Sequence, residues 1–259
     1  RVDVVWANCD RRSNGRNFTC CRCRYCDCLA LFLKLNNCAN LRGMIISPGR
    51  NYIFVHIPKT GGTSVAVALE QRAMANDILI GDTPKAKRRR KRLDKLRAKG
   101  RLWKHSTLAD IDGVVSASEL APYFIFTLVR NPWDRLVSYY AWLRAQSFRH
   151  PAVALAKRSD FATFLRDPMT QTSFRTGTSA SYVRDAKGHE RADLFIRLEH
   201  LEEDIISLEQ HLGFSLRPLP NENRSARTAD YRRNYSDEMA EIVASFCAAD
   251  ISRFGYRFG

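Results

Sequence analysis

The sequence has no long apolar run, and it is short of acidic residues. A membrane-spanning helix needs about 18 to 20 mostly apolar residues, but the best candidate among these 259 residues, 28–35, is short and contains Lys34. We therefore expect a soluble protein. The 27 Asp and Glu are outnumbered by 42 Lys and Arg, which gives a formal net charge of +15. Such a surplus attracts nucleic acid, acidic lipid, anionic polysaccharide or a phosphate-bearing cofactor, and composition does not choose among them.

Cysteine is scarce outside the N-terminal part of the chain. Seven of the eight cysteines lie between Cys9 and Cys38, and the eighth is Cys247. A disulfide framework is normally spread through the fold that it stabilises. The cysteine usage after residue 44 is therefore typical of a reducing compartment.

The cysteine-rich N-terminal segment does not carry a recognisable metal site. Cys23 and Cys26 form one CxxC pair, but no second CxxC or His pair stands at a workable distance for zinc. We interpret residues 1–43 as a non-native or disordered leader, and we expect the functional domain to span 44–259 from Met44. We expect no metal ion to take part.

Apolar runs and turn residues after residue 44 predict strands that alternate with helices. Such alternation favours a single α/β domain, with a parallel sheet flanked by helices on both faces. The expected strands are 51–57, 124–129 and 194–197, the expected helices are 64–73, 132–143, 161–165, 201–212 and 237–254, and 217–235 is expected to be a loop.

The first candidate site lies where a predicted strand passes into a predicted helix, in the segment 56–64, HIPKTGGTS. Two adjacent glycines let the backbone turn tightly, so that successive N–H groups can point at one anion. The start of the helix adds N–H groups and the positive end of its dipole. A lysine and three hydroxyls complete a P-loop-like site for a tetrahedral anion. The candidate ligands are Lys59, Thr60, Gly61, Gly62, Thr63 and Ser64.

This loop is not a Walker A motif, which requires Gly, four residues, and then Gly-Lys-Ser/Thr. Here Lys59 precedes the glycines, and no lysine follows Gly62. The spacing therefore argues against a P-loop kinase or nucleotide hydrolase, which stays the alternative enzyme class.

The second candidate site begins where the predicted strand 124–129 ends. Arg130 offers a bidentate fork for a phosphate, and Ser138 adds a hydroxyl about two turns into the helix that follows. Asn131 and Pro132 are a typical N-cap and first helical residue. We expect Arg135 to pair with a neighbouring acid or to pack its aliphatic stem, and we do not count it as a ligand.

Together, the two segments resemble the PAPS-dependent sulfotransferases, and most of all their Golgi carbohydrate-type group (the heparan and chondroitin enzymes) and its bacterial relatives. PAPS is 3′-phosphoadenosine 5′-phosphosulfate, and its product after transfer is adenosine 3′,5′-bisphosphate (PAP). The resemblance implies that HIPKTGGTS holds the 5′-phosphosulfate, that Arg130 and Ser138 hold the 3′-phosphate, and that Lys59 assists catalysis. It also predicts a cytoplasmic enzyme of the bacterial type that sulfates a hydroxyl, with carbohydrate as the expected acceptor.

A general base is expected because an acceptor hydroxyl has a pKa far above 7. His105, between the two motifs, resembles the histidine that carbohydrate sulfotransferases place there, although Lys104 stands where those enzymes have glycine. The alternative is an ordinary surface histidine next to a basic segment.

That basic segment, 85–101, contains eleven Lys or Arg in seventeen residues. It is either a solvated face or a docking surface for an anionic or sugar-type acceptor. Aromatic residues do not interleave with the charges before Trp103, so nucleic acid is an unlikely partner. A basic nucleic-acid-binding protein stays the second alternative, but it would leave the two anion motifs unexplained.

Overall fold

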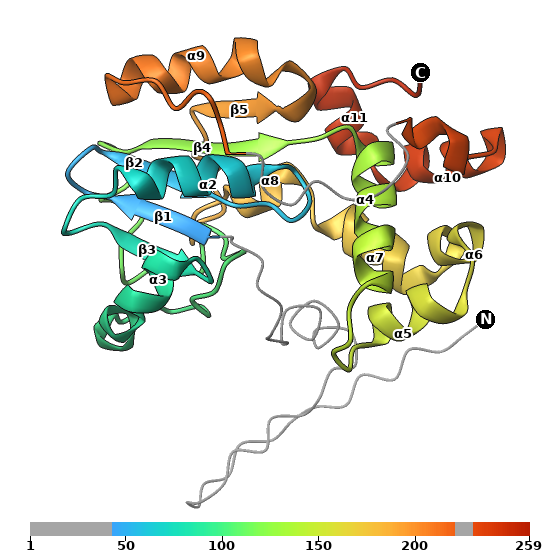
Figure 1. Ribbon diagram of the computed structural model, residues 1–259, viewed down its shortest axis with the longest axis horizontal. Helices are drawn as coiled ribbons and strands as arrows, with labels where there is room; N and C mark the ends of the chain where they lie inside the picture. The colour runs from blue at the N-terminus through green and yellow to red at the C-terminus, as the bar shows by residue number, and fades with distance from the viewer. Residues whose placement is uncertain (1–42, 221–229) are drawn as a thin grey trace, which may run out of the picture. The chain divides into compact units, whose positions relative to one another are not determined.

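A mixed five-stranded sheet forms the centre of the computed structural model, which describes residues 43–220 and 230–259 (Figure 1). The strand order is β3-β1-β2-β4-β5. The described residues all belong to one compact unit, and the predicted leader falls almost wholly outside them. The strands are β1 (Gly43–Ser47), β2 (Tyr52–Val55), β3 (Ile78–Gly81), β4 (Phe124–Val129) and β5 (Leu194–Arg197).

The predicted α/β class is confirmed, and the sheet is parallel only on one side. β2, β4 and β5 run parallel, with Tyr52 opposite Phe124 and Phe126 opposite Leu194. β1 is antiparallel to both β2 and β3. The antiparallel part, which was not foreseen, arises because β1 returns directly into β2 through a tight turn that has Asn51 at φ 51°. Two strands joined so closely can pair only as an antiparallel hairpin.

Each face of the sheet carries its own apolar core. On one face, α2 (Gly62–Gln71) and α9 (Leu201–Leu212) pack Val65, Leu69 and Ile205 against Phe54 and Phe126. On the other face, α8 (Ser179–Tyr182) and the irregular segment 102–123 cover the strands. This burial on both faces explains why the strands read as continuous apolar runs.

The helix after β4 begins as predicted. α4 (Pro132–Arg144) has Asn131 as its N-cap, whose side chain accepts a hydrogen bond of 3.1 Å from the N–H of Trp133. Figure 1 places α4 at the end of β4, close to several helices of the second half of the chain. These are α5 (Pro151–Arg158), α6 (Phe161–Arg166), α7 (Pro168–Thr176), α10 (Asp237–Phe246) and α11 (Ala248–Phe254).

Several predicted bounds were wrong. β1 and β3 were missed, and Met44, the expected first residue of the functional domain, lies inside β1. The helix expected over 237–254 is two helices that meet at Cys247. The basic segment forms α3 (Pro84–Arg89) and a 3-10 helix, η1 (Arg90–Lys95). Two further 3-10 helices are η2 (Leu198–His200) and η3 (Tyr231–Asn234), the latter within the predicted loop 217–235.

Candidate active site

The loop between β2 and α2 turns through two left-handed residues. Lys59 has φ 67° and Gly61 has φ 81°. A left-handed conformation is costly for a residue with a Cβ, so Lys59 needs support from its surroundings. Part of that support comes from Thr60, whose Oγ1 donates a hydrogen bond of 2.9 Å to the carbonyl of Ile57.

Close neighbours explain why this loop contains two glycines. A Cβ on Gly62 would lie 2.8 Å from Cδ2 of His56 and 3.1 Å from Cζ of Phe54. A Cβ on Gly61 would lie 2.6 Å from Cδ1 of Leu198, in addition to the cost of its positive φ. Any other residue at either position would displace the loop or its neighbours.

The two predicted anion motifs meet at one edge of the sheet because β2 and β4 are adjacent parallel strands. Nη1 of Arg130 donates a hydrogen bond of 3.2 Å to the carbonyl oxygen of Lys59. Behind them, Oε1 of Glu199 accepts a hydrogen bond of 2.7 Å from the N–H of Asn131 at the start of α4. The structure therefore brings the backbone of Lys59 and the side chain of Arg130 together.

Arg130 is held in place by Asp134, a residue that sequence reasoning did not connect with Arg130. Nε and Nη2 of Arg130 donate to Oδ2 of Asp134 at 2.9 and 2.6 Å. The two side chains are only 11% and 18% exposed. Ser138 lies one turn further along α4 and is buried. The i, i+4 spacing of arginine and aspartate is the sequence signal that could have revealed the pair.

Arg135 contacts the loop from the other side. Its Nε donates a hydrogen bond of 3.1 Å to the carbonyl of Pro58, and its guanidinium lies 5.1 Å from the ring centre of Phe174. Because the guanidinium is the group that lies over Phe174, the expectation that Arg135 packs its aliphatic stem stays a prediction. Asp134, the acid next to Arg135 in the sequence, pairs with Arg130 instead.

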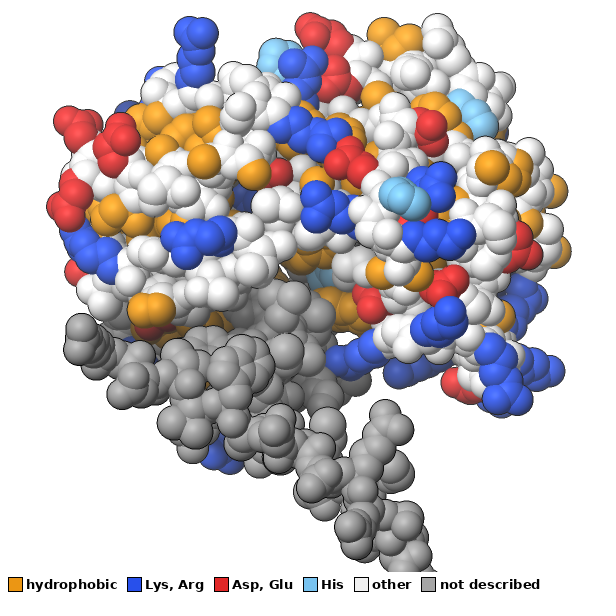
Figure 2. Space-filling model, turned by 180° about the vertical axis from the view of Figure 1, so that it is seen from behind, with side chains coloured by type: hydrophobic (Ala, Val, Ile, Leu, Met, Phe, Trp, Pro, Cys, Tyr) orange, Lys and Arg blue, Asp and Glu red, His pale blue; other side chains and the backbone are white. Residues whose placement is uncertain are grey.

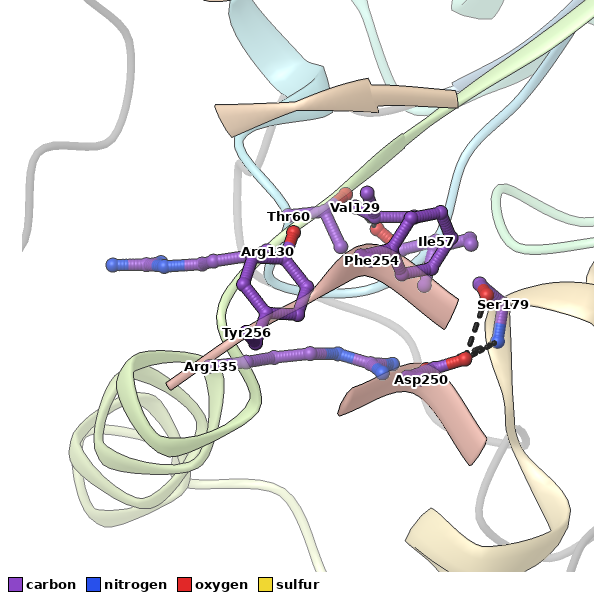
Figure 3. Close-up of a pocket in the computed structure, with 9 residues that line it drawn as sticks. All are labelled: Ile57, Thr60, Val129, Arg130, Arg135, Ser179, Asp250, Phe254 and Tyr256. Atoms are coloured by element: carbon purple, nitrogen blue, oxygen red, sulfur yellow. Dashed lines mark hydrogen bonds between the residues drawn. The ribbon is translucent and has the colours of Figure 1, made fainter. Parts of the chain in front are cut away.

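A small pocket opens beside these arginines, outside the carboxyl ends of β2 and β4 (Figure 3). Figure 3 shows Arg135 extending toward Asp250 and Ser179, whereas Arg130 runs the other way. Oγ of Ser179 donates a hydrogen bond of 2.7 Å to Asp250. Ligands of open α/β sheets bind in this position relative to the strands. The lining residues are Ile57, Thr60, Val129, Arg130, Arg135, Ser179, Asp250, Phe254 and Tyr256.

His105 lies next to the loop although 49 residues separate it from His56 in the sequence. Its Nδ1 is 2.8 Å from the carbonyl oxygen of His56. A carbonyl can only accept a hydrogen bond, so Nδ1 carries the proton and Nε2 is the basic nitrogen of the neutral ring. The ring is 5% exposed and packs edge-on against His56 and Trp103, at 4.9 and 5.0 Å between ring centres. The surface-histidine alternative is wrong.

Trp142, which sequence reasoning missed, adds an aromatic surface beside the catalytic candidates. Nζ of Lys59 lies 5.8 Å from the ring centre of Trp142, one turn beyond Ser138 on α4. A cation held over an aromatic face at this distance is attracted by the ring. Two of its flanking rings, Tyr139 and Phe148, lie 6.0 Å away.

The basic segment is folded against the sheet rather than extended. Nη1 of Arg89 donates to the carbonyls of Met74 and Asp77 at 2.8 and 3.2 Å. Lys104, which lies just after the segment and next to His105, pairs with Asp82 at 3.2 Å. Figure 2 shows Lys and Arg side chains gathered at lower right, over α3 and η1. The exposed ones are Lys87, Arg88, Arg90, Lys91, Arg92, Lys95, Arg97, Lys99 and Arg101.

Two features are absent from the described ranges, 43–220 and 230–259. No helix there is both long and apolar enough to cross a membrane. In the same ranges, no three His, Cys, Asp or Glu side chains come together as metal ligands would.

Comparison with known proteins identifies the family. Among solved structures, the chain is similar to the mouse sulfotransferase SULT7A1 complexed with PAP, at 17% identity over 80% of this chain and 67% of that one, with a TM-score of 0.36. A search of curated proteins found no match. A family model described as the sulfotransferase family matches residues 42–257. Since that match takes in all the strands and both anion motifs, the chain belongs to the sulfotransferase family.

Proposed function

We propose that this protein transfers the sulfuryl group of PAPS to an acceptor hydroxyl. The observation that carries the proposal is the meeting of two anion motifs at the ends of adjacent parallel strands, linked by the hydrogen bond from Arg130 to the carbonyl of Lys59. A donor with phosphates on both sides of its ribose requires two such sites close together. Membership of the sulfotransferase family supports the same donor.

The 5′-phosphosulfate binds the loop that follows β2. Lys59, the N–H groups of the left-handed turn and the first turn of α2 surround the anion, and the hydroxyls of Thr63 and Ser64 lie at the start of that helix. A helix N-terminus stabilises negative charge. The further loop residues assigned to this group are Thr60, Gly61 and Gly62.

The 3′-phosphate binds Arg130 and Ser138. Asp134 orients the guanidinium of Arg130 through two hydrogen bonds, so the arginine meets the phosphate in a fixed position. A guanidinium that is already held in position loses less entropy when the phosphate binds.

During transfer, the bond between sulfur and the bridging oxygen of the 5′-phosphate breaks, and a new bond forms from sulfur to the acceptor oxygen. Nε2 of His105 takes the acceptor proton, because the carbonyl of His56 holds the proton of the ring on Nδ1. Lys59 and the loop N–H groups stabilise the negative charge that develops on the leaving phosphate oxygen. The products are a sulfated acceptor and PAP.

The acceptor is a sugar-type or anionic molecule, with carbohydrate as the expected class, and it reaches His105 along the basic segment. The exposed cations of α3 and η1 lead through Arg101 to Trp103, whose ring packs against His105. Positive charge attracts an anionic chain, and an aromatic face stacks on the apolar face of a sugar.

Calorimetric titration of PAP tests the donor site. We expect wild-type protein to bind PAP with micromolar affinity, and Lys59→Ala and Arg130→Ala to weaken it by about tenfold or more, since each removes a charged hydrogen-bond donor. Lys157→Ala, which removes a charge from the exposed surface of α5, is the control and should bind as wild type does. A folded wild-type protein that does not bind PAP would refute the proposal.

A further inference from the structure

Two arginines near the start of α4 hold consecutive carbonyls of the phosphosulfate loop. Nε of Arg135 donates to the carbonyl of Pro58 at 3.1 Å, and Nη1 of Arg130 donates to the carbonyl of Lys59 at 3.2 Å. The same two peptide groups carry the N–H of Lys59 and the N–H of Thr60. These N–H groups belong to the turn that the proposed function assigns to the 5′-phosphosulfate.

This arrangement favours anion binding in two ways. A carbonyl oxygen repels an anion, and a guanidinium that holds it fixes which side of the peptide the oxygen occupies. A cationic donor on the carbonyl also polarises the peptide and makes its N–H a stronger donor. The left-handed Lys59 needs such external hydrogen bonds, because its φ of 67° is unfavourable for a residue with a side chain.

Of the two arginines, Arg135 is the better candidate for a residue whose only role is to hold the loop. Arg130 also pairs with Asp134 and is assigned to the 3′-phosphate, so its substitution would disturb several contacts at once. The guanidinium of Arg135 is also held by the ring of Phe174 on α7, whose centre lies 5.1 Å away. A donor held by packing loses little entropy when it forms its hydrogen bond.

We propose that Arg135 is a positioning residue that holds the phosphosulfate loop in its anion-binding conformation through the carbonyl of Pro58. The inference rests on the proposed function and adds to it a residue for which the resemblance to known sulfotransferases implied no role. Arg135 acts on the 5′ side of the donor and leaves the 3′ side unchanged.

The test compares Arg135→Met with Arg144→Met. Methionine keeps an unbranched aliphatic stem and removes the donor, whereas Arg144 is an exposed residue of the same helix, so its replacement controls for the lost charge. Calorimetry with adenosine 5′-monophosphate should show about tenfold or more weaker binding for Arg135→Met. Binding of adenosine 3′-monophosphate should stay as in wild type, and Arg144→Met should bind both nucleotides normally.

Hydrogen exchange in the ligand-free protein separates positioning from direct contact. If Arg135 holds the loop, the amides of Lys59 and Thr60 exchange faster in Arg135→Met before any nucleotide is added. Weaker binding of adenosine 5′-monophosphate with unchanged exchange would overturn the inference, because Arg135 would then be a direct ligand. An equal loss of affinity for adenosine 5′-monophosphate and adenosine 3′-monophosphate in Arg135→Met would overturn the inference as well.

A second variant covers the case in which Arg135→Met does not fold. Arg135→Lys keeps the charge and one donor, and we expect it to recover part of the affinity for adenosine 5′-monophosphate and part of the amide protection. Wild-type behaviour of this variant in both measurements would overturn the requirement for the guanidinium. Failure of the wild-type protein to bind either nucleotide would refute the proposed function itself, whereas normal binding by both Arg135 variants would refute only the positioning role.

Discussion

Gly61 offers a sharp test of the loop geometry, because two separate costs oppose any side chain there. Its φ of 81° lies in the left-handed region, where alanine costs about 1 to 2 kcal/mol. A Cβ would also lie 2.6 Å from Cδ1 and 3.2 Å from Cδ2 of Leu198. Inserting a methyl group into an occupied space costs roughly 1 to 3 kcal/mol. We take the low end, because Leu198 is only half-buried and can partly turn away.

The second cost can be isolated with a matched glycine. Gly213 ends α9 with φ 72°, and a Cβ there would meet nothing within 4 Å. Gly213→Ala therefore carries only the cost of the positive φ. We expect Gly61→Ala to lower the free energy of unfolding by about 1 kcal/mol more than Gly213→Ala does, and adding Leu198→Ala to Gly61→Ala to recover most of that difference.

Urea denaturation measures the three variants, and calorimetry with PAP follows on the same samples. Gly61→Ala should weaken PAP binding by about tenfold, because small displacements of an oriented site are costly, whereas Gly213→Ala should bind PAP normally. Equal destabilisation by the two single substitutions, with unchanged PAP affinity, would refute the geometry described for the loop.

Three further predictions concern the base, a buried acid and the N-terminal boundary. His105→Ala should lower single-turnover transfer from labelled PAPS by about 100-fold to 10,000-fold while PAP affinity stays unchanged; full turnover would remove the histidine from the role. Burial raises the pKa of Glu70 above its ordinary 4.5, so the folded state holds this proton more tightly and the stabilisation is lost as pH rises through the raised pKa. The stability of Glu70→Gln relative to wild type should therefore increase as pH rises in denaturation experiments between pH 4 and 8, and a constant difference would contradict the stated cause. Residues 44–259 should fold and bind PAP like the full chain, whereas residues 48–259 should not fold, because Met44, Ile45 and Ile46 of β1 are fully buried; circular dichroism decides both cases.

The parts of the fold that the sequence predicted are those that a short run of neighbouring residues specifies. The run FIFTLV is long and apolar enough to predict β4, and Asn131 followed by Pro132 predicts the start of α4. β1 could not be found in this way, since its five residues directly follow the cysteine-rich segment and show no alternation. Because it is buried on both faces between two other strands, only the tertiary structure reveals it.

The candidate site was predictable where one motif supplies all its parts. Lys59 and the two glycines follow from the strand–loop–helix pattern, and Arg130 follows from the same pattern on the next strong strand. The hydrogen bond from Arg135 to the carbonyl of Pro58 spans 77 residues, and no local pattern encodes it. The acceptor class and the cellular compartment stay predictions, because the residues that bind the sulfuryl donor do not depend on either of them.

A crystal structure of the protein with PAP tests the central claim most directly. The account predicts that the 5′-phosphate lies within hydrogen-bonding distance of Lys59 and the N–H groups of Gly62 and Thr63. It also predicts that the 3′-phosphate contacts Arg130 and Ser138. PAP bound elsewhere, for example on the exposed cations of α3 and η1, would contradict the assignment of both motifs.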